Sequence, residues 1–268
     1  MSSTTTFEAT PVNSTELLTP ELIHAARDDL KQVNVHTSAL RMSYGEGGSP
    51  FTVYTIVVSC VATKTWWIIQ KRYSQFYELY QQLRKVEKKT KGKTALNELH
   101  ELLQPLFRLQ FPKKSLRLDT DEMMLQRKKA FNALTRALMQ MRSAIVCARM
   151  CQCNAELSNE LKYLLSSLDE FLTVPDRQRE EETRHAAQWL SSSDDSSPSE
   201  DCIAHHLDDD SCPICLCELK DANDSWMGET VLELDCKHSF HEGCVIQWLE
   251  RHVSCPICRQ QVTGGVMH

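Results

Sequence analysis

The strongest constraint on this chain is a cluster of cysteines and histidines near its C-terminal end. The spacing is C-x-x-C, twenty intervening residues, C-x-H-x-x-H-x-x-C, ten intervening residues and a second C-x-x-C. Eight thiol and imidazole side chains in this order are the ligands that two tetrahedral zinc ions need. So short a segment cannot bury enough apolar surface to fold alone, so bound metal would supply much of its folding free energy. In chain order the ligands are Cys212, Cys215, Cys236, His238, His241, Cys244, Cys255 and Cys258.

A disulfide framework is the alternative for a chain with 12 cysteines. The first nineteen residues contain no basic residue and no apolar core, which predicts that there is no secretory signal. The longest apolar run, within VYTIVVSCVA, is much shorter than the roughly 18 residues of a spanning helix. We therefore expect a protein on the cytosolic side, where thiols stay reduced and clustered cysteines favour metal. Cys147, Cys151, Cys153 and Cys217 lie outside the ligand spacing and are interpreted as buried or spare thiols.

The net charge of -6 hides a difference between the two parts of the chain. Residues 20–175 contain 23 Lys and Arg against 15 Asp and Glu, whereas residues 176–268 contain 7 against 19. A basic first part favours an anionic partner, which the acidic second part would repel, so we expect two functional units. A membrane surface is the favoured partner, and no nucleic-acid partner is expected, because no aromatic–basic binding motif appears.

Hydrophobic periodicity predicts a mixed α+β fold before the cluster. Residues 30–73 are predicted to form strands, with a glycine-containing hairpin connection around residues 45–48. Helices are predicted from Ser74 to about residue 86, over about 121–148 and over about 155–172. Residues 95–119 are predicted to be irregular because Pro105 and Pro112 break helices. Residues 176–210 are acidic and Ser-rich, which predicts a linker with no more than a short helix near Trp189.

The order and spacing of the eight ligands resemble a RING finger of the two-histidine subtype, in which the ligands interleave in a cross-brace. The resemblance implies two structural zinc ions, each with three cysteines and one histidine and with no open position for hydrolysis. The first zinc would be held by Cys212, Cys215, His241 and Cys244, and the second by Cys236, His238, Cys255 and Cys258.

Four further positions resemble those of RING ubiquitin ligases. Ile214, Trp248 and Pro256 match the shallow apolar groove that docks a ubiquitin-conjugating enzyme, and tryptophan suits such an interface. Arg259 matches the cation that bridges the conjugating enzyme and its thioester-linked ubiquitin, a role for which a planar guanidinium is suited. The alternatives are that Trp248 is a core residue of a small module and Arg259 an ordinary surface arginine.

The first part of the chain, over residues 28–174, resembles a PX domain, a phosphoinositide-binding fold. The resemblance rests on RYSQF after the last predicted strand, followed in order by FPKK and LQRKKAF. It implies that Arg72 grips the 3-phosphate of the inositol headgroup with paired hydrogen bonds, and that Tyr73 packs against the inositol. It also implies that Lys114 contacts the phosphate linked to glycerol and that Arg127 binds inositol hydroxyls.

The apolar segment LLQPLFRLQF precedes the FPKK motif. Leu106 and Phe107 are interpreted as inserting into the bilayer beside the headgroup, with packing on the domain as the alternative.

These resemblances predict a PX-like domain (28–174) with a three-stranded antiparallel sheet and a helical subdomain, and a cross-brace RING (211–262). They are joined by a flexible acidic linker (175–210) and flanked by a disordered tail (1–27) and a short tail (263–268). We expect a cytoplasmic E3 ubiquitin ligase that associates with phosphatidylinositol 3-phosphate on endosomal membrane. It would promote direct ubiquitin transfer from the conjugating enzyme to a lysine of an unknown protein substrate. The alternatives are a non-enzymatic lipid-binding adaptor whose RING scaffolds proteins, and a soluble ligase whose PX-like half binds protein.

Overall fold

The computed structural model describes residues 32–43, 49–115, 118–150, 155–191, 211–219 and 230–268. The predictions for the tail 1–27, the glycine turn at 45–48, Cys151, Cys153 and residues 192–210 lie outside the described residues. No helix among the described residues is both long enough and apolar enough to cross a membrane.

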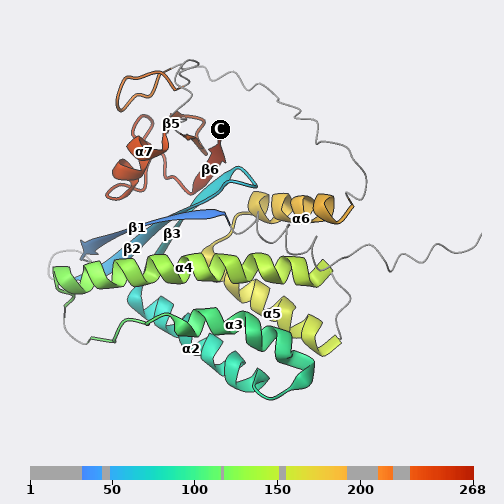
Figure 1. Ribbon diagram of the computed structural model, residues 1–268. Coiled ribbons are helices and arrows are strands. Elements are labelled where there is room, and N and C mark those ends of the chain that lie inside the picture. Colours follow the sequence, from blue (N-terminus) through green and yellow to red (C-terminus); the bar gives the residue numbers. More distant parts are fainter. Residues whose placement is uncertain (1–31, 44–48, 116–117, 151–154, 192–210, 220–229) are drawn as a thin grey trace, which may run out of the picture.

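One antiparallel sheet of six strands runs through the molecule in the order β1-β2-β3-β6-β4-β5 (Figure 1). Strands β1 (Val33–Met42), β2 (Phe51–Cys60) and β3 (Thr65–Arg72) form a meander, as their β-branched and aromatic residues favour. Strands β4 (Val231–Leu234), β5 (Ser239–His241) and β6 (Gly264–Met267) belong to the C-terminal module, by which we mean residues 211–268. The predicted three-stranded sheet is therefore extended by the C-terminal module.

Strand β6 lies in a segment that the sequence predicted to be a tail. It pairs with β3 through Thr65–Val266, Trp66–Gly265 and Trp67–Gly264, and with β4 on its other side. A Cβ atom on Gly264 would lie 2.4 Å from the carbonyl oxygen of Trp66, so only glycine fits this close approach. The two halves of the chain thus share backbone hydrogen bonds, which hydrophobic periodicity could not predict for so short a strand.

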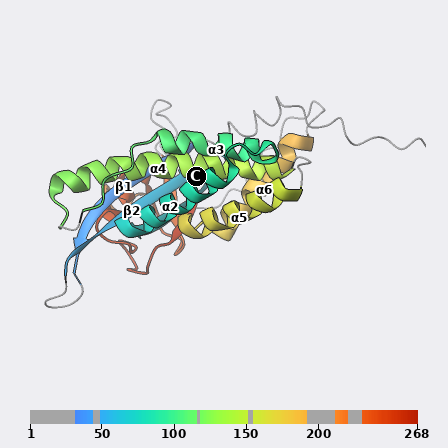
Figure 2. The same ribbon diagram turned by 90° about the horizontal axis from the view of Figure 1, so that it is seen from below.

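Four helices cover one face of the β1–β3 strands: α2 (Tyr73–Thr90), α3 (Asn97–Arg108), α4 (Asp121–Met150) and α5 (Ala155–Leu172) (Figures 1 and 2). Three of them occupy the predicted helical segments, and α3 replaces part of the segment predicted to be irregular. Pro105 lies inside α3 and removes a backbone donor. The helix forms nonetheless because Leu99, Leu103 and Leu106 bury one face of it in the core.

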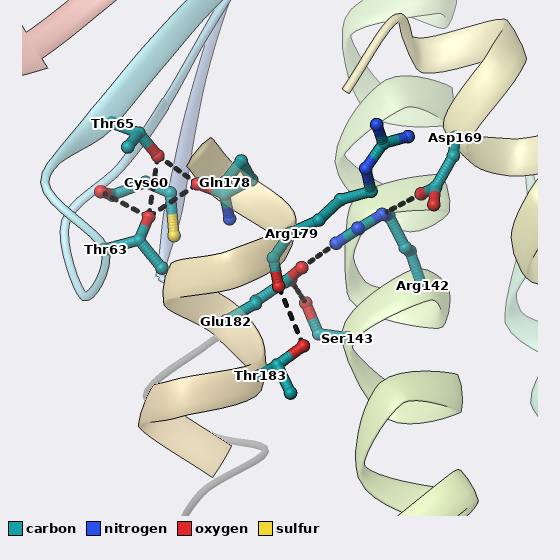
Figure 3. Close-up of polar contacts among 10 residues, drawn as sticks. All are labelled: Cys60, Thr63, Thr65, Arg142, Ser143, Asp169, Gln178, Arg179, Glu182 and Thr183. Carbon is teal, nitrogen blue, oxygen red and sulfur yellow. Dashed lines mark hydrogen bonds and ion pairs between the residues drawn. The ribbon is translucent and has the colours of Figure 1, made fainter. Parts of the chain in front are cut away.

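Helix α6 (Asp176–Ser191) occupies the first part of the predicted linker. Glu182 of α6 pairs with the buried Arg142 of α4, which also pairs with Asp169 of α5 (Figure 3). Gln178 accepts hydrogen bonds from two threonine hydroxyls at the β2–β3 turn. The composition of this segment favoured a solvated linker, whereas these polar side chains are paired inside the protein. The first part of the predicted linker is therefore a helix that contacts α4.

Alternate side chains of the sheet enter two different cores. Trp67 faces the helices and donates a hydrogen bond from Nε1 to the carbonyl of Leu172 at 2.9 Å. Its neighbour Trp66 faces the C-terminal module and donates from Nε1 to the carbonyl of Glu233 at 3.2 Å. Both tryptophans are essentially inaccessible, at 0% and 1% exposure, so the β1–β3 strands are covered on both faces. The sheet residues on the helical side include Tyr54, Ile56, Val58, Trp67 and Ile69, and those on the module side include Val57, Trp66 and Ile68.

Candidate metal centres and docking surfaces

The eight predicted zinc ligands come together as two separate groups. Cys212, Cys215, His241 and Cys244 form the first group, and Cys236, His238, Cys255 and Cys258 form the second. Within each group the four ligand atoms all lie within 4.8 Å of one another. Each group draws its ligands from two separated parts of the chain, which is the interleaved arrangement of a cross-brace.

The spacing of the ligand atoms fits tetrahedral zinc. With Zn–S of about 2.3 Å and Zn–N of about 2.0 Å, a sulfur and a nitrogen ligand lie about 3.5 Å apart in a tetrahedron. The Sγ–Nδ1 separations are 3.3 Å for Cys215 and His241, 3.3 Å for Cys236 and His238, and 3.6 Å for Cys255 and His238. With four ligands converging in each group, both sites are closed and suited to structural zinc.

Each C-x-x-C pair is folded by the same tight turn. The backbone carbonyl of Cys212 accepts a hydrogen bond from the backbone N–H of Leu216 at 2.8 Å. The carbonyl of Cys255 likewise accepts one from the N–H of Arg259 at 3.0 Å. Leu216 and Arg259 both have left-handed backbone conformations, with φ of 63° and 60°. This turn brings the two sulfurs of a pair to the same side, where one ion can contact both. It also places Arg259 directly after the last ligand with its side chain exposed.

A hydrogen bond behind the first site sets the orientation of its histidine. Nε2 of His241 lies 3.0 Å from the carbonyl oxygen of Glu218 and donates to it, which leaves Nδ1 as the nitrogen that faces the thiols. Such a partner fixes the ring and makes the metal-facing nitrogen more basic. His241 itself is 5% exposed, so its position is set by the surrounding protein.

The thiols have opposed ionisation preferences without a cation. A hydrogen bond from the backbone N–H of Cys217 lowers the pKa of the Cys215 thiol to about 6. Burial, with a smaller contribution from the neighbouring cysteines, raises the pKa of the Cys236 and Cys244 thiols to about 12. A divalent cation is what allows several adjacent, partly buried thiols to be thiolates together. The donor set therefore fits zinc chemically as well as geometrically.

The predicted contacts for a conjugating enzyme lie at the surface of the C-terminal module. Ile214 is 41% exposed, and Trp248, on helix α7 (Glu242–Leu249), is 37% exposed. Trp248 donates a hydrogen bond from Nε1 to the carbonyl of Ser254 at 2.8 Å, which fixes the ring without burying it. Pro256 is half-buried. The alternative that Trp248 is a core residue is therefore wrong, because Val245 and Leu249 fill the inner face of α7 instead.

The predicted lipid contacts form a chain of neighbouring side chains. The ring of Tyr73 stacks beside that of Tyr77 with centroids 6.2 Å apart, and Nζ of the exposed Lys114 lies 5.8 Å from the Tyr77 centroid. Arg72, which precedes Tyr73, lies over the ring of Phe51 at 3.8 Å. Aromatic rings thus support the cations at this end of the sheet.

Arg127 differs from the other predicted lipid contacts because it is 4% exposed. Its guanidinium lies 4.0 Å from the centroid of the Tyr73 ring, pairs with Asp119, and donates to the carbonyl of Lys113 at 3.2 Å. In this structure Arg127 therefore positions Tyr73 and the segment around Lys113.

Leu106 and Phe107 do not form an exposed apolar tip. Leu106 is 1% exposed and packs inside the helical core, and Phe107 is half-buried against that core. Arg84 covers the Phe107 ring at 4.2 Å. The expectation of bilayer insertion is corrected for Leu106, because α3 turns this side chain inward.

Sequence reasoning missed the residues that join the two halves of the chain. Side chains of β1 and β2, chiefly His36 and Ser59, contact acidic side chains of the C-terminal module. The available signal was the nearly continuous apolar run of β2 together with the tryptophan pair after it. Such runs are typical of strands that are buried on both faces.

Comparison with known proteins supports the zinc module. Residues 210–259 match the Ring finger domain family. Over 53 residues the chain is 51% identical to the E3 ubiquitin-protein ligase RNF126 of Homo sapiens. These residues are 20% of this chain and 15% of that protein. Over 51 residues it is 43% identical to the E3 ubiquitin-protein ligase RNF181 of Xenopus tropicalis. These residues are 19% of this chain and 29% of that protein. No solved structure matches the chain.

The chain therefore spans less than a third of the length of these relatives. What the match and the geometry establish together is a RING finger with two sets of Cys and His ligands, as two structural zinc ions require. The expectations of a RING finger and of two zinc sites are confirmed.

Proposed function

We propose that the chain acts as a RING-type E3 ubiquitin ligase. The observation that carries this proposal is the exposed apolar surface of the C-terminal module, which lies beside two closed ligand groups. A module of this size has reason to bury such side chains, so their exposure favours a docking role. The exposed residues are Ile214, Leu216, Trp248 and Ile257.

The proposed mechanism requires no nucleophile from this chain. The lysine amine of a substrate attacks the thioester carbon on the conjugating enzyme, and the thiolate of that enzyme leaves. Bound zinc would serve as a structural cross-link between the cysteines and histidines of each group. Trp248 and Ile214 would hold the conjugating enzyme, and Arg259 would contact the bound ubiquitin through its planar donors. The acceleration comes from proximity and from a restrained thioester.

The test is ubiquitin-chain formation by the purified full chain with activating enzyme, ubiquitin and a panel of conjugating enzymes. We expect Trp248→Ala to lower the rate by about tenfold or more, because a tryptophan at the centre of an interface is often a hot spot. Tyr163→Ala is the matched control, since Tyr163 is an aromatic residue of α5 that is 68% exposed and lies outside the C-terminal module.

A protein that contains two zinc ions but forms no chains with any conjugating enzyme would contradict the ligase proposal. That result would favour the non-enzymatic adaptor, whose RING holds protein partners without promoting transfer.

We further propose that the N-terminal half, residues 32–191, binds phosphatidylinositol 3-phosphate through a PX-like surface and recruits the chain from the cytoplasm to endosomal membrane. The support is the neighbourhood of Arg72, Tyr73 and Lys114, because Arg72 precedes Tyr73 in the chain and Lys114 lies beside Tyr77, whose ring stacks with that of Tyr73. Arg72 and Lys114 would bind phosphates, and Arg127 would hold Tyr73 in position. The excess of basic residues over residues 20–175 agrees with an anionic surface as partner.

Sedimentation with vesicles that contain phosphatidylinositol 3-phosphate tests the lipid proposal. Arg72→Ala should abolish most of the binding, whereas Lys162→Ala, which removes an exposed cation of α5, should leave it unchanged. Equal binding by both variants would contradict the proposed role of Arg72 and favour the soluble ligase whose N-terminal half binds protein.

A further inference from the structure

Helix α7, which presents Trp248, lies against the module-facing side of the β1–β3 strands. Its inner residues Val245 and Leu249 are fully buried and belong to the same apolar cluster as Val57 of β2. Trp248 lies on the flank of this inner face, one turn after Val245, where it is 37% exposed. The direction in which Trp248 points is therefore coupled to how α7 sits on the sheet.

Both ends of α7 contact polar side chains of the sheet. At the first turn, the Ser59 hydroxyl donates to Oε1 of Glu242 at 3.4 Å. Directly after the last turn, Nε2 of His36 lies 2.7 Å from Oε1 of Glu250, and the Ser38 hydroxyl shares its proton between the carbonyls of Thr55 at 3.4 Å and Glu250 at 3.5 Å. None of these contacts lies within the C-terminal module itself.

The length of α7 matches the distance along the β1–β2 strands between the residues that contact its two ends. Ser59 of β2 pairs with Asn34 of β1, and Ser38 lies four residues further along β1. Four strand residues span about 13 Å. Eight residues of helix separate Glu242 from Glu250 and span about 12 Å. His36, Ser38 and Ser59 also share one face of the sheet, because strand side chains alternate.

We propose that β1 and β2 act as a positioning element for the docking helix, with His36, Ser38 and Ser59 holding α7 at its two ends. This inference rests on the proposed ligase function. An eight-residue helix is marginal without tertiary support, so the sheet keeps α7 formed and oriented before the conjugating enzyme arrives. Binding of the conjugating enzyme then carries a smaller free-energy cost for ordering α7.

The test compares the double variant His36→Ala/Ser59→Ala with Arg41→Ala. Arg41 is the matched control because it also lies on β1 with a half-exposed side chain in an ion pair, but its partner is Asp121 of α4. We expect the double variant to raise the Kd for an uncharged conjugating enzyme about two- to fivefold, the range for partly exposed polar contacts. Arg41→Ala should bind like the wild-type chain.

Three further readouts separate positioning from general damage. In the double variant the amides of α7 should exchange hydrogen faster, while zinc content and the turnover of the saturated complex stay at wild-type values. Restoring an ion pair of opposite polarity, with His36→Glu and Glu250→Lys together, should recover affinity relative to His36→Glu alone. Such a recovery of affinity would show that the contact between positions 36 and 250 matters, and not the identity of either side chain.

An unchanged Kd in the double variant would overturn the inference, as would a weaker Kd accompanied by loss of zinc. Failure of the ligase proposal gives a different result, since the wild-type chain would then form no ubiquitin chains with any conjugating enzyme of the panel. Faster exchange in α7 of the double variant would in that case still support the positioning of the helix by the sheet.

Discussion

The N-terminal half and the C-terminal module share one sheet but are stabilised differently. The N-terminal half encloses a large apolar cluster between β1–β3 and helices α2–α5, in which the rings of Phe76 and Phe131 stack with centroids 3.9 Å apart. The smaller cluster of the C-terminal module includes two buried metal ligands, Cys212 and Cys255, and three side chains from β2 and β3 of the N-terminal half. Part of the module's core is thus supplied by its neighbour and part of its stability by metal. The two halves should therefore respond differently to the same perturbation.

The largest expected effect follows zinc removal by a chelator. Structural zinc contributes about 10–16 kcal/mol in small zinc-dependent folds, so the C-terminal module should unfold without it. Residues 211–219 and 230–262 should lose hydrogen-exchange protection, while α4 and α5 keep theirs. The control is the same chelator saturated with calcium. Simultaneous loss of protection in both halves would mean that the shared sheet makes them one cooperative unit.

The next largest effect is expected inside the N-terminal half, from Arg142→Ala. Arg142 is 1% exposed and pairs with Asp169 and Glu182 across three helices (Figure 3). Its removal leaves the buried Glu182 carboxylate with the Ser143 hydroxyl but without a charged partner, which should lower the free energy of unfolding by about 3–5 kcal/mol in urea.

Arg179→Ala is the matched control for this network. Arg179 pairs with Asp176 at the surface of α6, where both side chains are largely exposed, so its loss should cost less than about 1 kcal/mol. Equal effects of the two substitutions would show that the buried pair does not hold α6 on the protein.

A smaller effect is expected from a substitution at the β3–β6 pairing, which joins the two halves. Gly264→Val places a side chain against the backbone of Trp66 and Trp67 and should push β6 away from β3. We expect a loss of about 1–3 kcal/mol in the free energy of unfolding, with both zinc ions retained.

Gly243→Ala is the control for this substitution, because no atom lies within 4 Å of a Cβ at that helical position. It should be neutral or slightly stabilising, since alanine favours helix over glycine. A Gly264→Val protein as stable as the wild-type chain would show that the β3–β6 pairing contributes nothing to the stability of either half.

The sequence alone predicted the features that depend on local spacing. The eight zinc ligands follow from intervals along the chain, because each C-x-x-C turn is a local structure, and the resemblance to a RING finger implied their division into two groups. The strands β1–β3 and the helices α2, α4 and α5 follow from the period of their apolar residues. The exposure of Trp248 also agrees with its predicted role at a surface.

Other features depended on contacts between distant residues, so local patterns pointed the wrong way. Pro105 suggested a break where burial of three leucines sustains α3. The acidic composition after residue 175 suggested a solvated linker, but Glu182 finds Arg142 forty residues earlier and is buried with it. Arg127 and Leu106 were expected at the surface, and packing places both inside.

What the sequence determined by itself is the chemistry of the C-terminal module, because the metal ligands are chosen by residue type and interval. The position of that module on the N-terminal half depends instead on contacts between residues far apart in the chain. Gly264, Trp66 and His36 lie far apart in the chain, and none of them has a pattern that names its partner. Their contacts arise because the second face of the β1–β3 strands carries apolar side chains that must be covered, and the C-terminal module covers them.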